Sequence, residues 1–246
     1  MKRIVTLQDM SCVGRCSITV ALPVISAMGV ECGILPTAVL STHTMFKTFT
    51  CKDLSDQIGP IADAWKQENI TFDAVYTGYL ASAEQCSQVC SFFDRFYDGN
   101  NLILVDPAMA DNGSLYPAFD ESFPTEMAKV CAKADIILPN ITEACLLTGT
   151  PYKTSYDESY IHELLKKLLA LGCYTAALTG VSYEKGRLGV VSLDRNGDTF
   201  SYFTRHCPQS YHGTGDLYSS TVLGGLMRGL SLGNALSLAA DFVVAC

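Results

Sequence analysis

The sequence lacks an excess of basic residues, long apolar runs and a leader-like start. It has 17 Lys and Arg against 25 Asp and Glu, a net charge of −8 at pH 7, and so it lacks the basic footprint of a nucleic-acid-binding protein. No apolar run reaches the roughly 18 residues that a membrane-spanning helix needs. Polar residues follow the first Met too soon for a secretory signal. We therefore expect a cytoplasmic protein without nucleic-acid or membrane partners.

Common catalytic and metal-binding motifs are also absent. The P-loop pattern, H-E-x-x-H and G-x-S-x-G do not occur, and the four histidines have no ligand spacing. The dinucleotide pattern G-x-G-x-x-G fails because no third glycine follows Gly213-Thr214-Gly215. The 11 cysteines contain no C-x-x-C pair. We interpret them as small, largely buried residues of a reducing compartment rather than metal ligands.

Short apolar runs alternate with helical stretches along most of the chain. The 246 residues are 48% hydrophobic and 17% charged, which provides ample material for a core. Strands are predicted at Arg3–Leu7, Cys32–Val39, Ala74–Thr77, Leu102–Val105, Ala134–Leu138 and Tyr174–Leu178. Helices are predicted at Gly14–Met28, Lys52–Glu68, Ala83–Phe96, Ile141–Leu147, Glu158–Leu171, Asp216–Leu230 and Asn234–Ala245.

This alternation predicts an α/β fold. Strands that are apolar on both faces and separated by helices indicate a mostly parallel central sheet in a three-layer α/β/α sandwich. Asn196-Gly197 lies between the β-type runs Arg187–Leu193 and Thr199–Thr204, which predicts an antiparallel hairpin extension. We expect a single domain over residues 1–246. The helical pattern runs to Cys246 without a capping glycine, so we also expect a truncated C-terminus.

The most informative stretch is Gly213-Thr214-Gly215-Asp216, which stands between the hairpin and a helix. Two glycines let the backbone approach a ligand closely, and the first amides of the helix form an anion site. Asp216 would be a poor phosphate ligand but a good base for a substrate hydroxyl. The alternative is structural: Thr214 caps the helix and Asp216 complements its dipole.

Acidic and amide side chains follow two other predicted strands. Asp106 and Asp111 follow one strand, where they would either recruit Mg²⁺ or form turns. Asn140 and Glu143 follow another strand and are spaced as a capping box. Ligands of open α/β sheets gather at such strand ends.

The chain resembles the ribokinase superfamily, in its pyridoxal/pyridoxamine kinase branch. Gly213-Thr214-Gly215-Asp216 is similar to the superfamily signature G-T/A-G-D. The supporting motifs cover essentially the whole chain in family order, and they are Leu7-Gln8-Asp9, Ser41-Thr42-His43-Thr44, Thr77-Gly78-Tyr79, Asp106-Pro107 with Asp111, and Pro139-Asn140 with Glu143.

The resemblance implies an ATP-dependent vitamin B6 kinase that phosphorylates the 5′-hydroxyl of pyridoxal, pyridoxine or pyridoxamine. It implies Mg²⁺, with K⁺ as a further cation, and a homodimer. It assigns catalysis to Asp216 and the anion hole to Gly213, Thr214 and Gly215. Substrate contacts fall to Asp9, His43, Thr44 and Tyr79, ATP contacts to Asn140 and Thr179, and metal contacts to Asp106, Asp111 and Glu143.

Two other functions remain open at this point. Hydroxymethylpyrimidine kinase shares the fold, and a non-catalytic B6-binding protein would share the pocket. Relatives often carry Ser at the position of Asp9, so the extra charge leads us to expect a preference for the cationic amine of pyridoxamine.

Overall fold

The computed structural model describes residues 1–207, 209 and 211–246. The strands of the main sheet are β1 (Arg3–Ser11), β2 (Glu31–Leu40), β3 (Cys51–Asp53), β4 (Ala74–Thr77), β5 (Leu102–Val105), β8 (Ile136–Ile137), β9 (Thr175–Val181), β10 (Arg187–Asp194) and β11 (Thr199–Arg205). Within the described residues they form one nine-stranded sheet in the order β11-β10-β9-β8-β5-β4-β1-β2-β3. A separate small hairpin consists of β6 (Ala110–Asp111) and β7 (Ser114–Leu115).

The sheet is mostly parallel, as the sequence predicts. Strands β2, β1, β4, β5, β8 and β9 pair in parallel from neighbour to neighbour. The hairpin strands β10 and β11 add to β9 in antiparallel pairing, which confirms the predicted extension. A short antiparallel strand, β3, closes the opposite edge and was not predicted.

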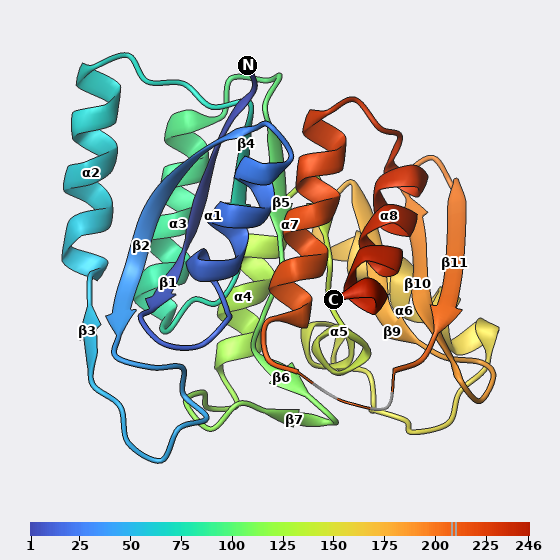
Figure 1. Cartoon of the computed structure of the whole chain (residues 1–246). Helices are drawn as coiled ribbons and strands as arrows, with labels where there is room; N and C mark the ends of the chain where they lie inside the picture. The colour runs from blue at the N-terminus through green and yellow to red at the C-terminus, as the bar shows by residue number, and fades with distance from the viewer. Residues whose placement is uncertain (208, 210) are drawn as a thin grey trace.

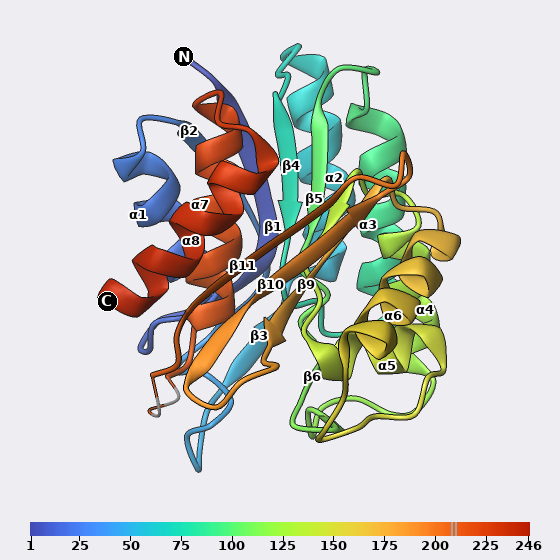
Figure 2. The same cartoon turned by 90° about the vertical axis from the view of Figure 1, so that its right-hand side faces the viewer.

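Helices cover both faces of the sheet and make three layers (Figures 1 and 2). One face carries α1 (Ile18–Ala27), α7 (Thr214–Met227) and α8 (Leu232–Ala245). The other face carries α2 (Ser55–Gln67), α3 (Ala83–Phe96), α4 (Phe123–Cys131), α5 (Ile141–Thr148) and α6 (Glu158–Leu171). The predicted three-layer α/β/α sandwich is therefore confirmed.

Strand β5 shows why the parallel strands are apolar on both faces. Ile103 and Val105 pack into the core under α2 to α6, while Leu104 between them packs into the core under α1, α7 and α8. Successive side chains of a strand point to opposite faces, so a strand with a helix layer on each side must be apolar throughout.

Two further features differ from the sequence prediction, and they concern the helices α4 and α1. Helix α4 was missed, although Phe123, Met127 and Val130 form a buried helical stripe. The first helix begins at Ile18, because residues before it form a loop in which Gly14 and Ser17 have positive φ angles. Over the described part of the chain, no helix combines the length and the apolar character that crossing a membrane would require.

Candidate active site

The first turn of α7 forms the centre of the site. Gly213 is the N-cap, with φ 80° and ψ 5°, and Thr214, Gly215 and Asp216 make up the first turn. Their amides have no carbonyl partner within the helix, so they point outward as anion-binding donors. A Cβ on Gly213 would lie 1.9 Å from the Arg15 carbonyl oxygen. Only glycine allows this turn to pack against the loop that precedes α1.

Asp216 is half-buried, and within the part of the chain that the structure describes one backbone amide donates to its side chain. Its Oδ2 accepts a 2.8 Å hydrogen bond from the Ser17 N–H. Burial raises the pKa of Asp216 to about 6, the Ser17 hydrogen bond opposes this rise, and the Asp9 charge adds to it. Oδ1 lies next to Gly78, where a Cβ would be 3.7 Å away. A carboxylate with this pKa is suited to accept a proton near neutral pH.

Asp106, directly after β5, lies beside the same turn. A Cβ on Gly215 would be 3.8 Å from Asp106 Oδ2, and the Ser219 hydroxyl donates to that oxygen at 2.8 Å. Burial and then the Asp216 charge raise the pKa of Asp106 to about 7. The structure therefore brings Asp106 and Asp216 together although they are far apart in sequence.

Asn140 and Glu143 form the predicted capping box at the start of α5. Asn140 Oδ1 accepts from the Glu143 N–H at 3.0 Å, and Glu143 Oε2 accepts from the Asn140 N–H at 2.8 Å. Glu143 Oε1 accepts from the Met109 N–H at 3.1 Å. Burial and the Asp106 charge raise the pKa of Glu143. Thr179 pairs with Asn140 through an isolated bridge, so the two residues expected at ATP are neighbours.

The donor set near Asp106 suits a hydrated divalent cation. Asp106 and Glu143 are buried carboxylates that repel each other, and a bound cation would relieve this repulsion. Within the described residues, no three His, Cys, Asp or Glu side chains gather closely enough to hold a metal alone. Mg²⁺ usually takes one or two carboxylates and completes its shell with water and phosphate oxygens, so two carboxylates fit it. Asp111 instead lies exposed on the β6–β7 hairpin, where Asn112 donates to its carboxylate.

The residues expected at the vitamer surround the end of β1. Asp9 is buried, and its carboxylate accepts from the hydroxyls of Ser17 at 2.5 Å and Ser11 at 3.3 Å. Tyr79 is half-buried, and burial and the nearby Asp9 charge raise its pKa to about 12. These two predicted residues therefore lie near each other.

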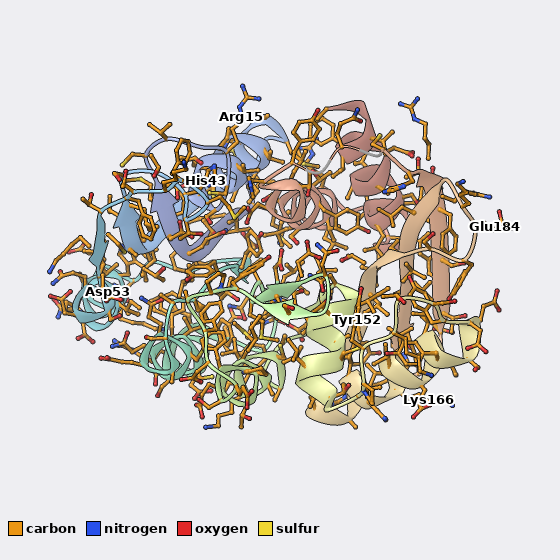
Figure 3. The ribbon with its side chains drawn as sticks, turned by 90° about the horizontal axis from the view of Figure 1, so that it is seen from below. Arg15, His43, Asp53, Tyr152, Lys166 and Glu184 are labelled. Atoms are coloured by element: carbon orange, nitrogen blue, oxygen red, sulfur yellow. The ribbon has the colours of Figure 1, made fainter. Side chains whose placement is uncertain are left out.

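The predicted pair His43 and Thr44 is more open. The His43 ring lies 4.7 Å, centroid to centroid, from the ring of His212, next to the Gly213 turn. Thr44 is exposed in the following turn. Figure 3 views the molecule from this end: His43 lies on the α1 side of the sheet, and the Arg15 side chain points outward.

Sequence reasoning missed two residues of the site. Ser17 contacts both Asp9 and Asp216, but the sequence prediction placed it inside the helix Gly14–Met28, so no signal pointed to it. Tyr116 follows the β6–β7 hairpin and is 37% exposed, and burial of its hydroxyl followed by the charges of Glu143 and Asp106 raises its pKa. Tyr116 stands in a segment where the sequence predicts no element, so no pattern pointed to it.

Taken together, these groups suit phosphoryl transfer to a hydroxyl. The α7 amides can hold a transferring phosphoryl group, Asp216 can accept the proton, and the carboxylates beside them can accommodate a cation.

Comparisons with known proteins agree with this chemistry. The chain is 26% identical over 243 residues to the pyridoxal kinase of Dictyostelium discoideum, which covers 92% of this chain and 78% of the relative. A Bacteroides thetaiotaomicron protein described as a phosphomethylpyrimidine kinase, crystallised with pyridoxal, has TM-score 0.94 and 37% identity, covering 99% of this chain and 86% of that one.

A second solved structure is the pyridoxal kinase from Lactobacillus plantarum, with TM-score 0.92 and 33% identity over 100% of this chain and 87% of that one. These likenesses confirm the ribokinase-like α/β fold expected from the sequence. The family model for phosphomethylpyrimidine kinase matches residues 14–246. The chain therefore belongs to the phosphomethylpyrimidine kinase family.

Proposed function

We propose that this protein is an ATP-dependent vitamin B6 kinase, which phosphorylates the 5′-hydroxyl of pyridoxal, pyridoxine or pyridoxamine. The observation that carries the proposal is Asp216, a carboxylate with a pKa raised to about 6 in the first turn of an anion-binding helix. Its likeness to pyridoxal kinases over nearly the whole chain supports the choice of substrate.

In the proposed reaction, the oxygen of the 5′-hydroxyl bonds to the γ-phosphorus of ATP, and Asp216 accepts the proton of that hydroxyl. The bond from that phosphorus to the β,γ-bridging oxygen breaks, and ADP leaves with the bond electrons. The amides of Thr214 and Gly215 donate to the transferring phosphoryl group. Asp9 and Tyr79 hold the vitamer ring, while Asn140 and Thr179 lie along the nucleotide phosphates.

The cation of the reaction is assigned to the carboxylates beside α7. Asp106 and Glu143 would hold Mg²⁺, in part through water, and Mg²⁺ supplies neutralisation of phosphate charge when bound. An acidic protein needs this local neutralisation because its field repels the nucleotide. A role for Asp111 at the metal, a K⁺ site, dimerisation and a cytoplasmic location stay predictions.

A substrate panel tests the proposal. ADP release is measured with pyridoxal, pyridoxine, pyridoxamine and hydroxymethylpyrimidine side by side. We expect turnover of the B6 vitamers with kcat/KM above that for hydroxymethylpyrimidine. Preference for hydroxymethylpyrimidine would identify the thiamin-pathway kinase instead. Vitamer binding without ADP release would identify a non-catalytic binding protein, which the retained Asp216 and its glycines argue against.

The pH dependence follows from the state of Asp216. Only the ionised carboxylate accepts a proton, so kcat/KM is expected to fall as the pH drops through about 6, the pKa of Asp216. If the base were an aspartate with an unperturbed pKa, this fall in kcat/KM would occur near pH 4. The profile is measured with pyridoxine and repeated for Asp9→Asn, in which the fall in kcat/KM should move slightly to lower pH, because the Asp9 charge no longer adds to the effect of burial on the pKa of Asp216. A fall near pH 4 in both proteins would contradict the assignment.

Asp9 is expected to set vitamer preference. Its buried negative charge would favour pyridoxamine, so Asp9→Asn should lower the pyridoxamine-to-pyridoxal ratio of kcat/KM by about tenfold. Asp63→Asn is the control, because it also removes one negative charge, in an exposed ion pair with Arg95 on α2 and α3. An unchanged pyridoxamine-to-pyridoxal ratio of kcat/KM in Asp9→Asn would show that Asp9 does not set vitamer preference.

A further inference from the structure

Ser17 has an unusual backbone and an unusual side-chain contact. It is the N-cap of α1, with φ 52° and ψ −132°, a combination that residues with a Cβ rarely adopt. Serine at an N-cap normally accepts a hydrogen bond from an amide of the first turn. The Ser17 side chain makes no such bond. Something other than helix capping therefore accounts for this serine and its strained conformation.

The contacts of Ser17 identify what it does instead. Its N–H donates to Asp216 Oδ2 at 2.8 Å, and its hydroxyl donates to Asp9 Oδ1 at 2.5 Å. Asp9 belongs to β1 and Asp216 to α7, so one buried residue joins acids from two elements. The positive φ lets the amide and the hydroxyl serve both carboxylates from one position.

We propose that Ser17 is a positioning residue that ties the vitamer-binding acid to the catalytic acid. The proposal rests on the proposed function, which assigns those roles to Asp9 and Asp216. Ser17 donates to Oδ2 of Asp216 and to Oδ1 of Asp9. Oδ1 of Asp216, beside Gly78, is then the oxygen left to take the substrate proton. Oδ2 of Asp9, which among the described residues accepts the long Ser11 contact alone, is left for the vitamer.

The two halves of the tie are separable by mutation, because one is a backbone group and the other a side chain. Ser17→Ala removes the hydroxyl that orients Asp9 but keeps the N–H that orients Asp216. We expect the KM for pyridoxamine to rise about tenfold, the equivalent of one hydrogen bond to a charged group, while kcat stays within about threefold. The KM for ATP should not change.

Three further variants make the test specific. Ser11→Ala removes only the long contact to Asp9 and is expected to raise the same KM less than Ser17→Ala does. In an Asp9→Asn background, Ser17→Ala should add less than twofold. Ser17→Gly should repeat the KM change with a higher Tm than Ser17→Ala, because glycine adopts φ 52° without strain. If Ser17→Ala folds poorly, Ser17→Gly still tests the loss of the hydroxyl, through the KM for pyridoxamine.

The outcomes separate this inference from the proposed function. An equal KM for pyridoxamine in wild type, Ser17→Ala and Ser17→Gly, or a loss of kcat alone, would overturn the positioning role of Ser17. The proposed kinase function would still stand. Urea unfolding of the Asp9→Asn and Ser17→Ala cycle tests the contact without turnover, and we expect clearly non-additive shifts in the midpoint. Additive shifts of the midpoint would overturn the positioning role of Ser17 whether or not the protein is a kinase. A wild-type protein that phosphorylates no vitamer would overturn the proposed function.

Discussion

Replacing Asp216 by Asn is expected to lower kcat for B6 vitamers by about 10²–10⁴, the range that a general base contributes. Asparagine keeps the size of the side chain and can still accept the Ser17 N–H, but it cannot take the substrate proton. The fold should not suffer. Burial holds the pKa of Asp216 at about 6, above its ordinary value, so its charge at neutral pH destabilises the folded state and a neutral amide relieves it.

The control for this variant is Asp56→Asn. Asp56 also stands in the first turn of a helix, α2, but it is exposed and α2 covers the face of the sheet opposite α7. If Asp216 only complements the α7 dipole, the two variants behave alike and lose about 0.3–1 kcal/mol of stability without loss of activity. Steady-state kinetics and thermal unfolding of both variants decide the matter. Asp216→Asn activity within about threefold of wild type would sink the assignment of the base.

Much of this architecture is readable from local patterns. Strand β5 is wholly apolar and is followed directly by Asp106, and α5 begins with a capping box, so neighbouring residues predict both boundaries. The hairpin of β10 and β11 follows from one Asn-Gly pair. The signature at Gly213 placed the start of α7 to within two residues: the sequence predicts a helix from Asp216, and the helix begins at Thr214. The alternative that Thr214 caps the helix is wrong, because Gly213 is the N-cap.

What the sequence could not show depends on contacts between distant segments. The sequence places Ser17 inside the predicted helix Gly14–Met28, and its role emerges only when β1 and α7 bring Asp9 and Asp216 to either side of it. The pKa of Asp106 is likewise a property of burial and of the Asp216 charge, which no local pattern contains. Helix α4 is a different case, since its apolar stripe was visible, and Pro124 in its first turn fits a helix start.

The acids of the site also explain why its glycines matter. Negative charge surrounds the proposed phosphate site, where the carboxyl groups of Asp106, Asp216 and Asp9 lie. The α7 amides must offset this charge at close range. The position of these amides depends on the Gly213 turn and on the loop packed against it. A change at Gly213 therefore disturbs the anion site and, through the loop, the contacts of Ser17.

Gly213→Ala is accordingly expected to lower kcat/KM at least a hundredfold. The new Cβ would lie 1.9 Å from the Arg15 carbonyl oxygen, so the α7 turn or the loop before α1 must move. A misplacement of about 1 Å in a catalytic group can cost about 10²-fold in rate. The positive φ of Gly213 adds strain of about 1–2 kcal/mol for alanine, so Tm should fall as well.

Gly197→Ala separates the two causes. Gly197 has φ 90°, close to the 80° of Gly213, but a Cβ there meets nothing within 4 Å. It stands in the β10–β11 hairpin, so its variant carries the backbone strain without the clash and should keep wild-type kcat/KM at a lower Tm. If Gly213→Ala matches Gly197→Ala in both kinetics and Tm, the close packing of the α7 turn on the Arg15 carbonyl is not what holds the anion site in place.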